Sequence, residues 1–127
     1  MKSNGRYQIL IVDDNKELAE LMKLLLEQNE FKTEYITDST YAFEKIQKDQ
    51  PNLVILDLLM PNLDGLRLCK KIKSTLDLLN TKVIIYSGKN YESDRRKALE
   101  LGADAYFVKP TKSSILLKKV KELLYIA

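Results

Sequence analysis

Four short apolar runs, each followed directly by polar residues, constrain the fold of this chain more than any other feature. Runs of this length and composition are typical of buried strands in a parallel sheet. A carboxylate at the end of such a strand is costly to bury without a partner. If the strands are parallel, their ends meet at one sheet edge, where α/β proteins bind ligands. The runs are Ile9–Val12, Leu53–Leu56, Val83–Tyr86 and Ala105–Val108, and the polar residues that follow them are Asp13 and Asp14, Asp57, Ser87 and Lys109.

Segments with helical periodicity separate these runs, so that strands and helices alternate along the whole chain. Five strands that alternate with five helices indicate a parallel sheet covered on both faces. Right-handed crossovers favour the doubly wound α/β class. We predict a (βα)5 sandwich with the flavodoxin-like strand order 2-1-3-4-5. The strands are expected at about 7–12, 32–36, 53–56, 82–86 and 104–108. The first helix is expected near 15–28, the second from 38–40 onward, and the third from the end of the loop 58–65 to about 74. The fourth is expected near 91–101 and the fifth at about 112–125.

Local signals indicate how several of these elements begin, end and pack. Any residue of Asp38–Thr40 could supply the N-cap oxygen of the second helix. Gly102 is expected to stop the fourth helix. The segment 58–65, which follows Asp57, is expected to be a loop that leads into the third helix. The predicted buried face of the first helix consists of apolar residues at helical spacing, namely Leu18, Leu21, Met22 and Leu25.

The length and charge of the chain limit its domain count and its partners. With 127 residues, the chain is expected to form one domain over 1–127, with an ordered core at about 6–125. The net charge of +3 is too small to argue for nucleic acid. The lysines of the last helix alternate with apolar residues, as on the solvated face of an amphipathic helix. We therefore expect no DNA binding within this chain.

Several absences narrow the expected location and chemistry. No segment approaches the ~20 apolar residues that span a bilayer, and residues 1–6 lack the apolar stretch of a signal peptide. The lone Cys69 cannot form an intramolecular disulfide and is expected to be a buried thiol. We expect a cytoplasmic protein without membrane contact. The chain has no histidine, which excludes histidine acid–base catalysis and histidine-containing zinc sites.

The predicted strand order brings the polar residues at the strand ends together. Adjacent strands lie about 4.8 Å apart, so Asp57 should have Asp13 and Asp14 on one side and Ser87 on the other. Lys109 should lie one strand further on. Three carboxylates this close repel one another, and a hard divalent cation relieves the repulsion. Oxygen ligands favour Mg²⁺ or Mn²⁺ over zinc, so we expect a metal-assisted phosphoryl-transfer site.

Four motifs at these strand ends resemble those of the receiver domains of two-component response regulators. Each motif is a weak pattern alone, but the four in this order at the ends of the right strands are highly specific. The resemblance covers the chain from Tyr7 to about Tyr125. The motifs are Ile11–Asn15, Leu56–Asp57 followed by Met60–Gly65, Ser87–Gly88 and Tyr106–Pro110.

The resemblance implies that Asp57 is the phosphoacceptor in a phosphorelay. The phosphoryl group would come from a histidine of a sensor histidine kinase or of a histidine phosphotransfer protein. Asp13 and Asp14 would hold Mg²⁺ together with Asp57 and the backbone carbonyl of Leu59. Lys109 and Ser87 would bind phosphoryl oxygens. The family pattern also implies a cis peptide bond between Lys109 and Pro110.

The resemblance also implies how the site would signal. Ser87 would be drawn toward a phosphoryl oxygen, and the ring of Tyr106 would turn inward to fill the space that opens. The face formed by 91–121 would then change, so that a downstream protein or a second copy of the chain binds there. Leu59 and Lys89 would lie beside the path of the water that removes the phosphoryl group. The chain is thus expected to be a switch and not an enzyme.

Each motif also has a plain structural explanation. The segment Asp13–Asn15 could be a helix N-cap with no further role. The motif Met60–Gly65 could be no more than a turn into a helix. Ser87 and Gly88 could form a turn, Tyr106 could be core packing, and Lys109 could be a solvated surface lysine. The convergence of all of them at one sheet edge favours the functional interpretation.

Three rival functions are open to a chain with this fold. A receiver-like interaction module that works without phosphorylation would usually lack one acid or the lysine. A flavodoxin-like cofactor carrier would need a phosphate-binding loop after the first strand, where Asp13 and Asp14 would repel a phosphate. A phosphohydrolase with an aspartyl nucleophile would need a second acid two residues past Asp57, where Leu59 stands.

Overall fold

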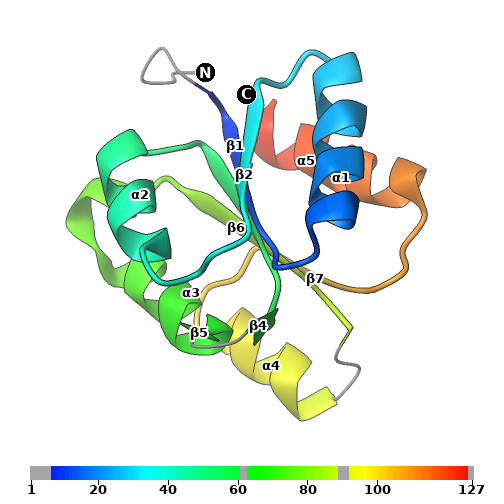
Figure 1. Cartoon of the computed structure of the whole chain (residues 1–127). Coiled ribbons are helices and arrows are strands. Elements are labelled where there is room, and N and C mark those ends of the chain that lie inside the picture. The colour runs from blue at the N-terminus through cyan, green and yellow to red at the C-terminus, as the bar shows by residue number, and fades with distance from the viewer. Residues whose placement is uncertain (1–6, 61–62, 89–91, 126–127) are drawn as a thin grey trace.

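Five parallel strands form the central sheet of the molecule (Figure 1). The computed structural model describes residues 7–60, 63–88 and 92–125. The strand order is β2-β1-β3-β6-β7, which is the predicted flavodoxin-like order. The strands are β1 (Ile9–Val12), β2 (Thr33–Ile36), β3 (Leu53–Leu56), β6 (Lys82–Ser87) and β7 (Ala105–Val108).

Helices cover both faces of this sheet, as a doubly wound fold requires (Figure 1). On one face lie α1 (Lys16–Gln28) and α5 (Ser113–Leu124), and on the other lie α2 (Ala42–Asp49), α3 (Gly65–Ser74) and α4 (Glu92–Glu100). A short 3-10 helix, η1 (Leu76–Leu78), follows α3. Two apolar clusters, one under each helical layer, form the core, and alternate residues of each strand enter different clusters.

The register of the sheet brings the strand ends to one edge. Val12 pairs with Leu56, so Asp13 and Asp57 leave the sheet side by side. The amide of Asp57 donates to the carbonyl of Val12 at 3.0 Å. In the strands on the other side of β3, Ser87 of β6 pairs with Val108 of β7, the residue before Lys109. The predicted convergence of the strand ends is therefore confirmed.

The segment after Asp57, predicted as a loop, contains a short antiparallel pairing of β4 (Leu59–Met60) with β5 (Leu63–Asp64). Asp64 then caps α3, because its Oδ1 accepts from the amides of Leu66 and Arg67 at 3.1 and 3.2 Å. A Cβ at Gly65 would lie 2.5 Å from the Leu58 side chain and 3.0 Å from its Cα, so only glycine fits there. Residues 61 and 62 of the predicted motif lie outside the described residues.

The buried face of α1 differs from the prediction. The helix buries Ala19, Met22 and Leu26, whereas Leu21 is 66% exposed. The other two leucines of the predicted face are only half-buried. Because leucines occur on several sides of this helix, periodicity alone could not decide which stripe contacts the sheet.

The predicted cap of the second helix was wrong. The helix α2 begins at Ala42, after the N-cap residue Tyr41, whose side chain makes no capping hydrogen bond. Instead, Asp38 Oδ1 accepts from the amide of Thr40 at 2.9 Å. Asp readily bonds its own backbone two residues on, and this local turn ends before the helix begins.

Two other local predictions are confirmed. Gly102 follows α4 with a φ of 106°, which lies in the left-handed region and ends the helix. Cys69 is buried in α3, and burial raises the pKa of its thiol to about 11. No helix among the described residues is both long and apolar enough to cross a membrane.

Candidate functional site

A cluster of three carboxylates lies at the edge of the sheet where β1 and β3 end. Oxygens of Asp13, Asp14 and Asp57 all lie within 4.8 Å of one another. Asp13 and Asp57 are 4% and 5% exposed, whereas Asp14 is open to solvent. The sheet register therefore brings together the three acids that the strand ends predicted.

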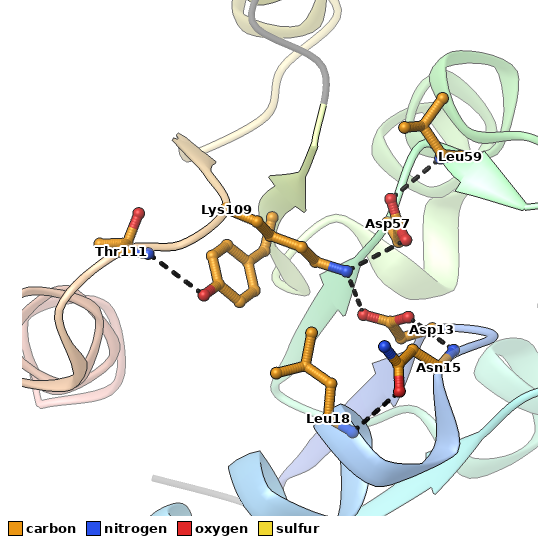
Figure 2. Close-up of polar contacts among 8 residues, drawn as sticks. Asp13, Asn15, Leu18, Asp57, Leu59, Lys109 and Thr111 are labelled. Atoms are coloured by element: carbon orange, nitrogen blue, oxygen red, sulfur yellow. Dashed lines mark hydrogen bonds and ion pairs between the residues drawn. The ribbon is translucent and has the colours of Figure 1, made fainter.

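Backbone amides orient the two buried carboxylates (Figure 2). Asp13 Oδ1 accepts from the amide of Asn15 at 2.9 Å, and Asp57 Oδ1 accepts from the amide of Leu59 at 2.9 Å. Hydrogen bonds to an ionised acceptor are strong, so they hold each carboxylate in one orientation. The second oxygen of each carboxylate, Oδ2, faces Lys109.

The ammonium group of Lys109 joins the two buried carboxylates (Figure 2). Its Nζ lies 2.6 Å from Asp13 Oδ2 and 3.2 Å from Asp57 Oδ2. Burial alone would lower the pKa of Lys109, but hydrogen bonds and charge attraction from Asp13 and Asp57 outweigh it and raise the pKa. The lysine is therefore charged and bound, not a solvated surface lysine. The peptide bond from Lys109 to Pro110 is cis, as the family pattern implied.

The N-cap of α1 is Asn15, not Asp13 or Asp14. Its side-chain oxygen accepts from the amide of Leu18 at 3.1 Å. Asp13 instead uses its two oxygens for the Asn15 amide and the Lys109 ammonium. Helix capping thus explains Asn15 of the motif but not Asp13 or Asp14, whose carboxylates can belong to a functional site.

Ser87 and Lys109 lie where the neighbouring strands β6 and β7 end, at the other side of the cluster. Ser87 is the last residue of β6 and is fully buried. Its carbonyl accepts from the amide of Lys109 at 2.8 Å. This backbone contact keeps a hydroxyl and the ammonium-bearing residue at the same sheet edge. Lys89, which was predicted to flank the path of water, lies outside the described residues.

Tyr106 lies in β7 and packs on the face covered by α2, α3 and α4. It is 4% exposed, so the ring is already turned inward in this structure. Burial raises the pKa of its hydroxyl, and the nearby Asp94 adds to the shift. Arg95 of α4 donates to the Tyr106 carbonyl at 3.2 Å, and its guanidinium carbon lies 6.0 Å from the ring centre. This link between α4 and the ring was missed from the sequence.

Tyr86 is a second residue beside the site whose role was not predicted from the sequence, where it only ended the apolar run Val83–Tyr86. Its ring centre lies 5.5 Å from Nζ of Lys109. Its hydroxyl accepts from the amide of Thr111 at 3.3 Å. The signal that could have found it is the alternation of side chains in a strand, since Tyr86 directly precedes Ser87.

The donors at the acid cluster suit a hard divalent cation. They are carboxylate oxygens, and Mg²⁺ binds oxygen ligands and keeps several waters. The exposed Asp14 leaves one side of the cluster open to solvent. The part of the backbone carbonyl of Leu59 in such a site stays a prediction.

The sequence is similar to that of known response regulators. Residues 9–121 match the response regulator receiver domain. The response regulator MprA of Mycobacterium leprae (strain TN) is 34% identical over 117 residues, which are 92% of this chain and 50% of that protein. The transcriptional regulatory protein GltR of Pseudomonas aeruginosa is 36% identical over 124 residues, which are 98% of this chain and 51% of that protein. The chain thus spans about half the length of these relatives.

Solved structures show the same likeness. The receiver domain of a DNA-binding response regulator from Colwellia psychrerythraea 34H superposes with a TM-score of 0.88 at 31% identity, covering 94% of this chain and 99% of that one. The receiver domain of a signal transduction histidine kinase from Syntrophus aciditrophicus gives a TM-score of 0.84 at 36% identity, covering 94% and 90%. Sequence, fold and site geometry agree, and the chain belongs to the response regulator receiver domain family of two-component signalling.

Proposed function

We propose that this receiver domain is a phosphoacceptor switch, in which Asp57 accepts a phosphoryl group from a histidine of a sensor kinase or a histidine phosphotransfer protein. The observation that carries the proposal is the position of Asp57. It is a buried carboxylate 3.2 Å from the Lys109 ammonium, in a cluster with two further acids. Phosphoryl transfer depends mainly on positioning and on neutralisation of charge, and this arrangement supports both.

Each residue of the cluster has a distinct role in the proposed transfer. The Leu59 amide fixes Asp57 Oδ1, so that Oδ2 forms the new bond to phosphorus while the bond from phosphorus to the donor nitrogen breaks. Lys109 then passes from the carboxylate to a phosphoryl oxygen as a point charge. The Ser87 hydroxyl donates a hydrogen bond to another phosphoryl oxygen.

The three acids together suit a divalent cation. Mg²⁺, or Mn²⁺, held by Asp13, Asp14, Asp57 and the carbonyl of Leu59, would neutralise carboxylate charge that otherwise repels an anionic donor. The three acids and Lys109 carry a net formal charge of −2, which one divalent cation balances.

The output surface of the switch would be the face formed by 91–121, on which a downstream protein or a second copy binds. Tyr106 supports this proposal because its ring packs inside the domain and Arg95 connects it to α4. A phosphoryl group that draws Ser87 inward would favour this inward ring, since only a differential contact can shift a population. Residue 91 lies outside the described residues. The unpaired Cys69 suits the reducing cytoplasm, which we propose as the location of the switch.

The first test is chemical. With Mg²⁺ and acetyl phosphate, intact-mass measurement should show one acid-labile phosphoryl group on the protein. Asp57→Asn should abolish it, and chelation of the metal should stop the reaction. The matched control is Asp77→Asn, the same change on an exposed carboxylate in η1, which should label normally. Equal labelling of Asp57→Asn overturns the proposal, and an unlabelled native protein indicates an interaction module that works without phosphorylation.

The second test follows the output. After activation with beryllofluoride, amide chemical shifts should change at 87–91 and 104–121 and change little along α1. Ser87→Ala should still accept a phosphoryl group but lose most of these shifts, because the hydroxyl donor that couples the site to the ring is gone. Changes concentrated on α1 would contradict this account of the switch.

A further inference from the structure

Tyr86 contacts Lys109 of the candidate site and packs in the apolar cluster under α1 and α5. It is the residue before Ser87 in β6 and is 6% exposed. Its side chain belongs to the apolar cluster under α1 and α5, whereas Tyr106 belongs to the cluster under the other three helices. The two tyrosines thus lie on opposite faces of the sheet.

The ring of Tyr86 contacts the charge of Lys109. Nζ lies 5.5 Å from the ring centre while it also binds Asp13 and Asp57. The face of an aromatic ring attracts a cation, and the attraction grows where water is excluded. Because the ring is buried and the lysine is mostly buried, this contact limits where the flexible lysine stem can place its ammonium.

The hydroxyl of Tyr86 contacts the backbone that carries Lys109. It accepts from the amide of Thr111 at 3.3 Å, shown by the dashed line at Thr111 in Figure 2. The carbonyl of the adjacent Ser87 accepts from the amide of Lys109 at 2.8 Å. The end of β6 therefore binds the segment 109–111 through two backbone amides, those of Lys109 and Thr111, and contacts the Lys109 ammonium through the Tyr86 ring.

We propose that Tyr86 is a positioning residue that holds the Lys109 ammonium in place for phosphoryl transfer, an inference that rests on the phosphoacceptor function proposed above. A lysine confined before the reaction loses less freedom when it binds the phosphoryl group. The ring also attracts the ammonium without competing for it as a carboxylate does, so Lys109 can move from Asp57 to a phosphoryl oxygen while the ring contact persists.

The test measures labelling rates with acetyl phosphate and Mg²⁺ by intact mass, with half-saturation and maximal rate determined separately. Tyr86→Leu keeps an apolar side chain but removes the ring, and the maximal rate should fall by about threefold to tenfold. Tyr86→Phe keeps the ring and loses only the bond to Thr111, so it should retain most of the rate. Phe107→Leu is the matched control, since Phe107 pairs with Tyr86 and packs against the same cluster, and it should label normally.

A double-mutant cycle separates positioning from simple core packing. In a Lys109→Gln background, Tyr86→Leu should cause no further loss, because the cation that the ring attracts is absent. An equal loss in both backgrounds overturns the inference, as does a native rate for Tyr86→Leu. Melting curves show whether each variant is folded, and Tyr86→Met replaces the leucine variant if that one unfolds. A native protein that takes up no phosphoryl group removes the proposed function and this inference together, whereas a labelled native protein without coupling removes only the inference.

Discussion

Replacement of Lys109 by glutamine should destabilise the metal-free protein and increase its stabilisation by Mg²⁺. The ammonium contacts two carboxylates that are 4% and 5% exposed, Asp13 and Asp57. Without it, these charges and that of Asp14 repel one another with no cation in contact. The free energy of unfolding should therefore fall in the absence of metal.

The structure sets the size of this effect. Removal of one partner of a fully buried ion pair costs about 3–5 kcal/mol. The Lys109 side chain is 18% exposed, which lowers the cost. Glutamine can still donate a neutral hydrogen bond, which recovers about 1 kcal/mol. We expect a loss of about 2 kcal/mol, which lowers the melting temperature of a domain of this size by roughly 6–10 °C.

The same variant should bind Mg²⁺ more tightly than the native protein. Loss of the ammonium changes the net formal charge of the three acids together with residue 109 from −2 to −3. Because a ligand that binds only the folded state stabilises it by mass action, millimolar Mg²⁺ should raise the melting temperature of Lys109→Gln more than that of the native protein.

Calorimetry or urea unfolding, with EDTA and then with Mg²⁺, measures both effects. Two controls sharpen the result. Lys118→Gln changes an exposed lysine of α5 and should alter neither quantity. Asp57→Asn should act in the opposite direction, raising the metal-free melting temperature and reducing the gain from Mg²⁺, because it removes a repelling charge. An unchanged metal-free stability for Lys109→Gln, or a lowered one for Asp57→Asn, would refute the reasoning.

Three further predictions concern pH, packing and reactivity. The raised pKa of Lys109 means that its contribution to stability is complete below its ordinary value of 10.5 and is lost as the pH rises through the folded value, so the difference in stability between native protein and Lys109→Gln should shrink only above about pH 10.5. Gly65→Ala should lower the free energy of unfolding in urea by about 1–3 kcal/mol, since its Cβ would collide with Leu58; unchanged stability would show that this loop can shift freely. The thiol of Cys69, buried and with a pKa raised to about 11, should react with an aromatic disulfide reagent only after unfolding in urea, and rapid reaction of the native protein would contradict its burial.

The strand positions and the acid cluster could be predicted because both depend on order along the chain. An apolar run of four residues must be buried, and the polar residue after it must lie where the strand ends. In a parallel sheet all such ends share one edge, so Asp13, Asp57 and Lys109 could be brought together before any distance was known. The cis bond at Pro110 was anticipated only through the family resemblance, because local sequence seldom determines the isomer.

The first and second helices show where sequence reasoning ended. Both Leu21 and Leu26 belong to the amphipathic helix α1, yet only Leu26 is buried. Which of two neighbouring apolar stripes meets the sheet depends on how the helix lies on it, and that is a property of the packed layers. Asp38 had the composition of a helix cap, but a bond to the amide of Thr40 engaged it in a turn before α2 began.

The amino-acid sequence by itself determined the fold class and the residues that follow each strand, because hydrophobic period and the order of elements along the chain are properties of the sequence. Only the tertiary structure decided the contacts that give Lys109 and Tyr106 their surroundings. Tyr86 approaches the lysine across neighbouring strands, and Arg95 reaches Tyr106 from a helix packed on the sheet. Such contacts join side chains whose separation depends on register, rotamer and helix position together, and no local pattern in the sequence encodes all three.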